Sequence, residues 1–208
     1  MSLLPAFPDP SAAPSAGDRR RQHVLRAARA CFSRHGFHGA SMGRICAEAA
    51  MSPGALYRYF PSKDAIIEAI AEEERVGAQA CMAAMAGPGP LVERMTAVAM
   101  DYLRGARDPE SGGLMVEICS ESLRNTAVGM RFHEIEGEVR STFREALLAA
   151  QASGEIAADL DLDAVMTIIF GIGDGLLLRL QLQPDFDLER IAPYLRSVLV
   201  GLLRPTAP

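Results

Sequence analysis

The chain has 208 residues, of which 49% are hydrophobic and 23% charged, and its formal net charge is −5. A chain of this length and apolar content can bury a sizeable core, which excludes an intrinsically disordered protein. Trp is absent and β-branched residues are sparse, whereas Leu and Ala are plentiful, so the composition predicts an all-α fold.

The cysteines do not suggest a metal site or a disulfide framework. They lie far apart, without a CxxC pair or a histidine cluster, at Cys31, Cys46, Cys81 and Cys119. This spacing differs from that of zinc sites and of disulfide-rich scaffolds. We therefore expect no metal and no cofactor.

Residues 1–17, MSLLPAFPDPSAAPSAG, have too short an apolar run and too many prolines for a signal peptide or a membrane anchor. We predict that they form a flexible tail. No later segment has the roughly 18 uninterrupted apolar residues of a membrane span. The sequence therefore predicts a cytoplasmic protein without a membrane partner.

Charge is divided unevenly along the chain. Residues 1–63 hold nine Arg or Lys and three Asp or Glu, a net charge of +6, whereas the rest of the chain has a net charge of −11. A basic N-terminal part on an acidic body is expected when only the first part binds a polyanion such as DNA.

The first predicted helix covers residues 19–35, with Asp18 as its N-cap and Gly36 as its left-handed end. Its first turn carries three arginines at the positive end of the helix dipole, where cations are unfavourable. Solubility alone can explain them, and so can an external anion that neutralises them. We favour the anion.

Serines are expected to cap the next three helices. Ser41 begins a short helix, Ser52 begins a second one with Pro53 in its first turn, and Ser62 begins a longer one. Two helices of about two turns are too short to be stable alone. We therefore expect the first helix to pack over both.

Helical spacing assigns the residues of the third helix to two sides. Leu56 and Phe60 share one face. This face is expected to form a small core with Leu25, Phe32 and Ile45. The residues that point away or flank that core are Gly54, Ala55, Tyr57, Arg58 and Tyr59. A slim helix edge beside a guanidinium and two phenols suits entry into the major groove of DNA.

Helical patterns continue over residues 63–85, 90–106, 112–123, 126–152, 162–182 and 187–203. Breaks rich in Gly and Pro separate them, and no strand pattern is convincing. The sequence predicts about nine helices in two domains. These are a three-helix, helix-turn-helix DNA-binding head over residues 18–63 and a helical body over residues 64–208, for which the family resemblance described below implies ligand binding and dimerisation.

The last two predicted helices suggest how the chain assembles. Residues 162–182 are apolar in nearly every direction, so this helix needs cover on all sides. Two such helices from each of two chains would make a four-helix bundle. The residues expected at this dimer interface are Ile168, Ile172, Leu176, Leu195, Val198 and Leu202.

Soft and aromatic side chains of the body are candidates for a ligand pocket. The candidates are Met95, Tyr102, Met115, Cys119, Phe132, His133, Phe170 and Asp174. Core packing is the alternative for each of them. His133 can equally lie on the surface, and Asp174 can either meet a cationic ligand or pair with an arginine.

The segment GFHGASMGRICAEAAMSPGALYRYFPSKDAII resembles the DNA-binding segment of the TetR family of transcriptional regulators. It carries the family's Ile-x-x-x-Ala helix, its Ser-x-Gly-x-Leu-Tyr-x-x-Phe pattern and the following Ser-Lys. The resemblance runs from Arg20 to near Ala71. The later part of the chain is similar only in its helical layout and in GDGLLLRL.

The resemblance implies which residues bind DNA. Ser41 would bond a phosphate, while Tyr57 and Lys63 would hold the DNA backbone. The residues along base edges or the nearby backbone would be Ser52, Pro53, Gly54, Ala55 and Tyr59. Arg44 and Arg58 are expected contacts because of their charge and direction.

One position departs from the family pattern. The family usually has glycine in the corner between the two short helices, whereas this chain has Ala50. A left-handed alanine costs on the order of 1 kcal/mol. The angle between the two helices is therefore left open.

The resemblance further implies a homodimer that represses transcription from a palindromic, double-stranded DNA operator. A small apolar or amphipathic effector would bind in the body and release the DNA. Two other classes remain open. One is a helical ligand sensor or adaptor without operator binding, for which Ala50 is the only hint. The other is an all-α enzyme with Cys31 or Cys119 as its nucleophile.

Overall fold

The computed structural model describes residues 15–206, apart from the side chains of residues 81, 109, 110 and 127. Within that range all regular structure is helical, which confirms the all-α prediction and the nine helices expected. The elements are α1 (Ala16–Gly39), α2 (Met42–Glu48), α3 (Pro53–Tyr57), α4 (Lys63–Met82), α5 (Leu91–Ala106), α6 (Pro109–Ser122), α7 (Thr126–Ser153), α8 (Leu162–Leu182) and α9 (Ala192–Leu203), with short 3₁₀ helices at Ala83–Ala86 and Leu188–Ile191.

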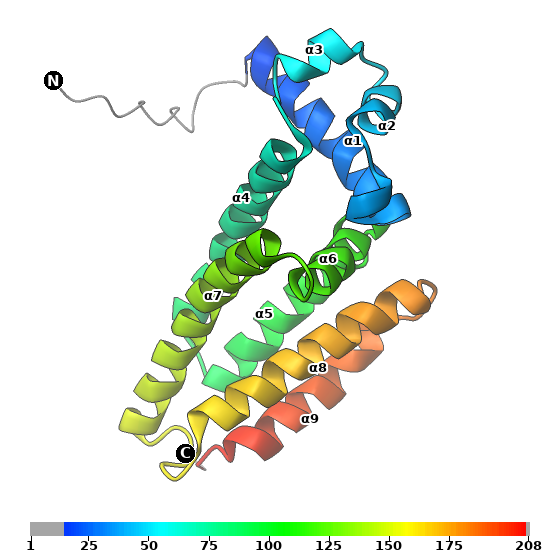
Figure 1. The fold of residues 1–208 in the computed structure, drawn as a ribbon. Coiled ribbons are helices and arrows are strands. Elements are labelled where there is room, and N and C mark those ends of the chain that lie inside the picture. Colours follow the sequence, from blue (N-terminus) through cyan, green and yellow to red (C-terminus); the bar gives the residue numbers. More distant parts are fainter. Residues whose placement is uncertain (1–14, 207–208) are drawn as a thin grey trace, which may run out of the picture.

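The helices form an elongated molecule with a small head at one end (Figure 1). Helices α1, α2 and α3 make the head, and α1 packs against α6 of the body. Helix α4 leaves the head and runs along the body beside α7, while α8 and α9 lie together at another side of the body. Two helices therefore connect the head to the body, α4 through the chain and α6 through packing.

Helix α1 begins earlier than the sequence predicted. Ser15 is its N-cap, and its hydroxyl accepts a hydrogen bond from the Asp18 backbone N–H at 3.1 Å. The Asp18 carboxylate in turn accepts from the Ser15 N–H, so Asp18 is the third residue of a capping box and not the cap itself. Ser15 thus caps α1 and residues 16–17 belong to it, while the remaining part of the predicted tail, residues 1–14, lies outside the described residues.

The serine caps are confirmed. The Ser41 hydroxyl accepts from the Arg44 N–H at 3.3 Å, and the Ser52 hydroxyl accepts from the Ala55 N–H at 3.4 Å. These bonds satisfy backbone donors that a helix start leaves without intrahelical acceptors. Gly36 also has the expected left-handed φ of 67°, although helical backbone resumes after it and runs to Gly39.

The core of the head includes residues from outside the head. The five apolar residues expected there are at most 3% exposed and lie in one cluster, namely Leu25, Phe32, Ile45, Leu56 and Phe60. The same cluster contains Ile66 and Ile70 of α4 and Leu114 of α6. The domain boundary between residues 63 and 64 stays a prediction, but the buried core of the head extends beyond it.

The body has its own buried clusters, built mainly from α5, α7, α8 and α9. Helix α8 is long and apolar enough to cross a membrane by length and composition, and a single helix of this kind is weak evidence for a membrane span. The boundaries of α8 are those predicted.

Helix α6 begins at Pro109, three residues before the predicted start, because Asp108 is its N-cap and accepts a hydrogen bond from the Ser111 N–H.

Candidate nucleic-acid interface and ligand site

Helix α3 presents a thin, exposed edge. Ser52, Pro53 and Gly54 are exposed and Ala55 is half-buried, whereas Leu56 on the opposite side is fully buried. A Cβ added at Gly54 would meet no atom within 4 Å among the described residues. The backbone of α3 can therefore approach a groove closely, as a reading helix must.

The corner between α2 and α3 bends at Ala50, which has a left-handed φ of 48°. The backbone closes around it through hydrogen bonds from Ala50 N to Ala47 O and from Met51 N to Cys46 O. His23 of α1 also lies with Nε2 2.9 Å from the Ala49 carbonyl oxygen. Because a carbonyl can only accept, Nε2 carries the proton there. The corner thus makes the turn that glycine would make.

The contact of His23 with the corner between α2 and α3 was not predicted from the sequence. It follows from the packing of α1 across the corner, 26 residues away in the chain. A single histidine on a predicted helix gives no local signal of that contact.

Aromatic rings and arginines flank α3. The Tyr57 side chain is 50% exposed. The Arg58 guanidinium lies over the Tyr59 ring at 5.4 Å, and that of Arg21 lies over the Phe60 ring at 5.1 Å. These contacts hold the two guanidinium groups against rings that directly follow α3 in the chain. Arg44 and its neighbour Ser41 are also exposed, at the start of α2.

Lys63 has a different environment from the one expected. Its ammonium donates to the Phe37 carbonyl oxygen at 2.7 Å and lies 3.4 Å from that of Ala40. The side chain is half-buried and ties the first residue of α4 to the end of α1. A contact with the DNA backbone is open to Lys63 only through its remaining N–H group.

Not every cation of the head is available to an external anion. Arg29 pairs with Glu73, at 3.0 Å, and with Glu74, both on α4. Arg34 pairs with Glu48 at 2.7 Å. The charges of Arg29 and Arg34 are therefore balanced by carboxylates of the protein itself.

Three of the predicted ligand residues influence one another on the body, where Tyr102 and Asp174 are partly open to solvent and Cys119 is half-buried. Burial raises the pKa of the Cys119 thiol to about 11, with further contributions from the carboxylates of Asp174 and Glu136. Burial, together with Asp174 and Cys119, also raises the pKa of Tyr102. The Asp174 pKa is raised by burial and by Glu136. Side chains from α5, α6 and α8 therefore converge on one acidic region.

A small apolar cavity of about 50 Å³ adjoins this region, between α5, α7, α8 and α9. Its lining includes Met95 and Tyr102 among the predicted ligand residues. Phe170 packs edge-on against Phe143 at 5.5 Å, and the Arg140 guanidinium lies 4.9 Å from its ring centroid.

The structure does not place His133 in a pocket. Its side chain is 73% exposed, and its Nδ1 lies 3.7 Å from the Glu136 carboxylate on the same helix. Of the two alternatives left open for His133, its exposure favours that of a surface residue. Met115 and Phe132 are half-buried.

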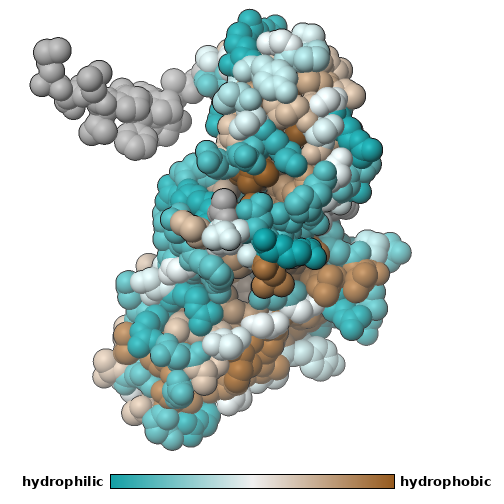
Figure 2. Space-filling model, in the orientation of Figure 1, coloured by the Kyte–Doolittle hydropathy of each residue, from teal (hydrophilic) through white to brown (hydrophobic). Residues whose placement is uncertain are grey.

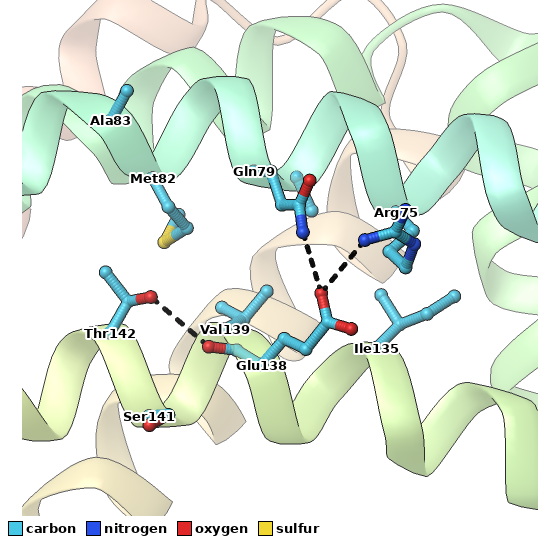
Figure 3. A pocket seen from close by; sticks show the side chains of 10 residues that line it. Arg75, Gln79, Met82, Ala83, Ile135, Glu138, Val139, Ser141 and Thr142 are labelled. Atoms are coloured by element: carbon cyan, nitrogen blue, oxygen red, sulfur yellow. Dashed lines mark hydrogen bonds and ion pairs between the residues drawn. The ribbon is translucent and has the colours of Figure 1, made fainter. Parts of the chain in front are cut away.

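A larger groove of about 520 Å³ lies between α4 and α7 (Figure 3). Glu138 of α7 bridges it, because its carboxylate accepts from Gln79 at 3.0 Å and lies 3.5 Å from Arg75. Apolar side chains such as Met82, Ile135 and Val139 line the rest of the groove together with two hydroxyl groups. The lining of this groove contains no residue that the sequence predicted as ligand-binding.

Helices α8 and α9 expose an apolar face that differs from the predicted interface. Leu195 is only 7% exposed, and Ile172 and Leu176 pack against the same cluster of this chain. Leu195 belongs to the chain's own core, and Ile172 and Leu176 are partly buried against it, because the inward side of α8 is as apolar as its outward side. Leu202 is half-buried.

The outward side of these helices defines what we call the α8–α9 face. Its large members are Ile168, Leu178, Leu182, Tyr194 and Val198, which are 41% to 74% exposed. Gly171 and Gly175 lie between them on α8, and a Cβ at either would meet no atom within 4 Å in the described part of the chain. Figure 2 shows hydrophobic side chains gathered along α8 on the surface of the body.

The two parts of the chain match two family models. One is described as bacterial regulatory proteins of the tetR family and matches residues 24–70. The other is described as the C-terminal part of BetI-type transcriptional repressors and matches residues 88–204.

Individual proteins are similar over most of the chain. The HTH-type transcriptional regulator UidR of Escherichia coli (strain K12) is 31% identical over 186 residues, 88% of this chain and 92% of UidR. The structure of Salmonella enterica GusR has 32% identity and a TM-score of 0.77, covering 91% of this chain and 98% of GusR. FadR from Bacillus subtilis, solved in complex with stearoyl-CoA, shares the fold at 19% identity, with a TM-score of 0.74 over 86% of this chain and 97% of FadR.

A helix-turn-helix head with an exposed reading edge stands on an all-helical body, and both parts match the same class of regulators. The chain belongs to the TetR family of bacterial transcriptional regulators, with a C-terminal body of the BetI type.

Proposed function

We propose that the protein is a cytoplasmic repressor that binds a palindromic operator as a homodimer and releases it when a small effector binds in the body. The observation that carries this proposal is the exposed edge of α3, with Gly54 open to close approach and Tyr57 and Arg58 beside it. That edge suits the major groove.

In this proposal the head residues make two kinds of contact with DNA. Ser41, Arg44, Tyr57 and Lys63 hold phosphates, and the residues of α3 from Ser52 to Ala55, with Arg58 and Tyr59, lie along base edges or the nearby backbone. Phosphate contacts fix the register of the head, and contacts in the groove select the sequence. The exposure of Ser41, Arg44 and Tyr57 supports their role.

The homodimer is proposed to form through the α8–α9 face. Four helices, two from each chain, would bury this face in a bundle. A two-fold axis there would present two reading helices to successive turns of DNA, which explains a palindromic operator. The exposed positions Ile168 and Val198 from the predicted interface remain part of this proposal, together with Leu178, Leu182 and Tyr194.

The effector is proposed to bind where Tyr102, Cys119 and Asp174 converge, next to the small apolar cavity. An apolar or amphipathic molecule would place its apolar part against Met95 and its neighbours. It shifts the equilibrium only if it binds the form that releases DNA more tightly. A coupling of roughly 1–3 kcal/mol between the two sites is sufficient for appreciable release.

The decisive experiment measures binding of the full-length protein to duplex DNA from its own promoter by fluorescence anisotropy, together with its molar mass by light scattering. We expect a dimer that binds one sequence in preference to a scrambled duplex of the same length. A monomer that binds every duplex equally weakly would contradict the proposal.

The same experiment tests the alternative of a sensor without operator binding. The hint for that alternative was Ala50, and the left-handed φ of Ala50 keeps the corner bent. The geometry of the corner therefore does not favour loss of DNA binding. No residue arrangement among the described residues favours the enzyme alternative, and we propose no catalytic activity.

A further inference from the structure

Residues 36–40, which we call the joint, lie between the straight part of α1 and the start of α2. Gly36, with φ 67° and ψ 168°, interrupts the helical backbone, and the Ala40 N–H donates back to the Gly36 carbonyl oxygen at 3.1 Å. Ser41, the N-cap of α2, follows directly. The direction in which α2 and α3 leave the body therefore depends on how the joint is held.

Two helices outside the head hold the backbone of Phe37. Its N–H donates to the Oε1 of Glu117 on α6 at 2.8 Å. Its carbonyl oxygen accepts from the ammonium of Lys63, the first residue of α4, at 2.7 Å. One turn after Glu117, the buried carboxylate of Glu121 lies 3.3 Å from His38 Nε2. The joint is thus fixed to α6 and α4 by polar contacts to one short segment.

The packing around these contacts is close. A Cβ at Gly36 would lie 2.8 Å from the Glu117 carboxylate, and a Cβ at Gly113 of α6 would meet the Ser33 side chain of α1. Leu114, between Gly113 and Glu117, is 1% exposed and lies in the core of the head. Helix α6 therefore has little freedom to move without moving α1.

We infer that Glu117 is a positioning residue for operator binding, a carboxylate of the body that sets the direction of the head through the Phe37 N–H. This inference rests on the proposed function, because a fixed direction matters when two heads must reach two half-sites together. A carboxylate–backbone hydrogen bond is charge-assisted, so it is stronger than a neutral one. Without this hydrogen bond each head samples more directions. Binding to both half-sites then costs more conformational entropy, because both heads must be fixed in one direction.

The test compares binding to a full operator with binding to a duplex in which one half-site is scrambled. The operator is selected from random duplexes with the wild-type protein. Glu117→Met keeps the length of the side chain and removes the acceptor, Glu117→Gln keeps an acceptor oxygen, and Glu145→Met changes an exposed glutamate elsewhere on the body. We expect Glu117→Met to bind the full operator about 10-fold more weakly.

On the half-site duplex, Glu117→Met should bind like the wild type, because only one head is engaged. Glu117→Gln, which offers only a neutral acceptor, should bind the full operator with an affinity between those of the wild type and Glu117→Met, and Glu145→Met should match the wild type on both duplexes. An equal loss on the two duplexes would show that the head itself is damaged, and this overturns the positioning role. Unchanged binding to the full operator overturns it as well. A wild-type protein that prefers no duplex contradicts the proposed function instead.

A second measurement tests the contact without DNA. Gly36 has φ 67° and ψ 168°, a conformation that is essentially limited to glycine, and a Cβ there would lie 2.8 Å from the Glu117 carboxylate. Gly36→Ala therefore adds both backbone strain and contact with Glu117, and only the contact is relieved when Glu117 is truncated. We expect the fall in Tm caused by Gly36→Ala to be smaller in a Glu117→Ala background than in the wild type. Equal falls in the two backgrounds would refute close contact between Glu117 and the joint.

Discussion

Ala50 adopts a left-handed backbone conformation that alanine disfavours, and the surrounding structure tolerates it. It has φ 48°, and neighbouring backbone hydrogen bonds and the His23 contact with Ala49 hold the corner around it. The left-handed conformation costs alanine on the order of 1 kcal/mol more than glycine. That difference is still present in the folded protein as backbone strain.

We expect Ala50→Gly to raise the free energy of unfolding by up to about 1 kcal/mol, since the strain disappears. Urea denaturation followed by circular dichroism measures this. Ala47→Gly, at an exposed helical position of α2, is the control, and it should lower stability by about 1 kcal/mol. If both variants are destabilised equally, the strain at Ala50 has been overestimated.

The two residues expected to hold the DNA backbone should respond differently to truncation. Tyr57 is half-exposed, so Tyr57→Ala should weaken operator binding and leave Tm unchanged. Lys63 is bonded to the Phe37 carbonyl oxygen, so Lys63→Ala should lower both operator affinity and Tm. Thermal unfolding and anisotropy titrations separate the two effects. A Lys63→Ala variant with wild-type Tm would argue against the observed contact.

Cys119 should react slowly with alkylating reagents at neutral pH, because only the thiolate is nucleophilic and its pKa is raised to about 11. Asp174 contributes to that rise by repelling the thiolate. Asp174→Asn should therefore lower the pKa of Cys119 and increase its rate of alkylation at pH 8. Peptide mapping by mass spectrometry after iodoacetamide treatment follows this residue alone. An unchanged rate would mean that the two groups do not interact.

Hydrogen bonds between residues close in sequence could be predicted, and hydrogen bonds between residues far apart in sequence could not. Ser41 and Ser52 bond N–H groups three residues ahead, so the local pattern was sufficient. Glu117 bonds Phe37 across 80 residues, and nothing near either residue in sequence indicates the other. The hydrogen bond from Lys63 to Phe37, 26 residues apart in sequence, was not predicted for the same reason.

At the scale of elements, helix boundaries followed from the sequence more closely than helix orientation. Helix α8 occupies the residues predicted, since Asp161 caps it and an apolar run fills it. The sequence did not show which side of α8 faces outward, because apolar residues surround the helix axis and the hydrophobic pattern has no preferred direction. Leu195 on α9 was assigned outward and lies inward. The sequence pattern identified two apolar helices but did not indicate which side of each packs against the rest of the chain.

The α8–α9 face yields a matched test of dimerisation. Ile168 on this face and Leu148 on α7 are both 47% exposed, so Asp at either position should leave the protomer folded. Ile168→Asp should give monomers because it places a charge in the proposed interface. Leu148→Asp should remain dimeric. Light scattering with circular dichroism measures both, and a folded Ile168→Asp dimer would exclude this face.

At the scale of the whole molecule, the basic head and the acidic body should make DNA binding strongly dependent on salt. The net charge is +6 over residues 1–63 and −11 over the remaining residues. Each phosphate that the head neutralises releases counterions, so log Kd should rise linearly with the logarithm of salt concentration. Because Arg29 and Arg34 pair within the protein, we expect the slope to reflect fewer than nine cations. Anisotropy titrations between 50 and 200 mM salt test this, and a flat plot would contradict phosphate contacts.

The position of Leu114 in the core of the head has a practical consequence for protein engineering. A chimera that joins this head to a regulator of different effector specificity would inherit a foreign α6 under α1. Unless the graft also carries Leu114, Gly113 and Glu117, the transplanted head would sit on a mismatched surface. The unit that can be exchanged between regulators is therefore the head together with the α6 residues that contact α1, although α6 lies far from the head in sequence.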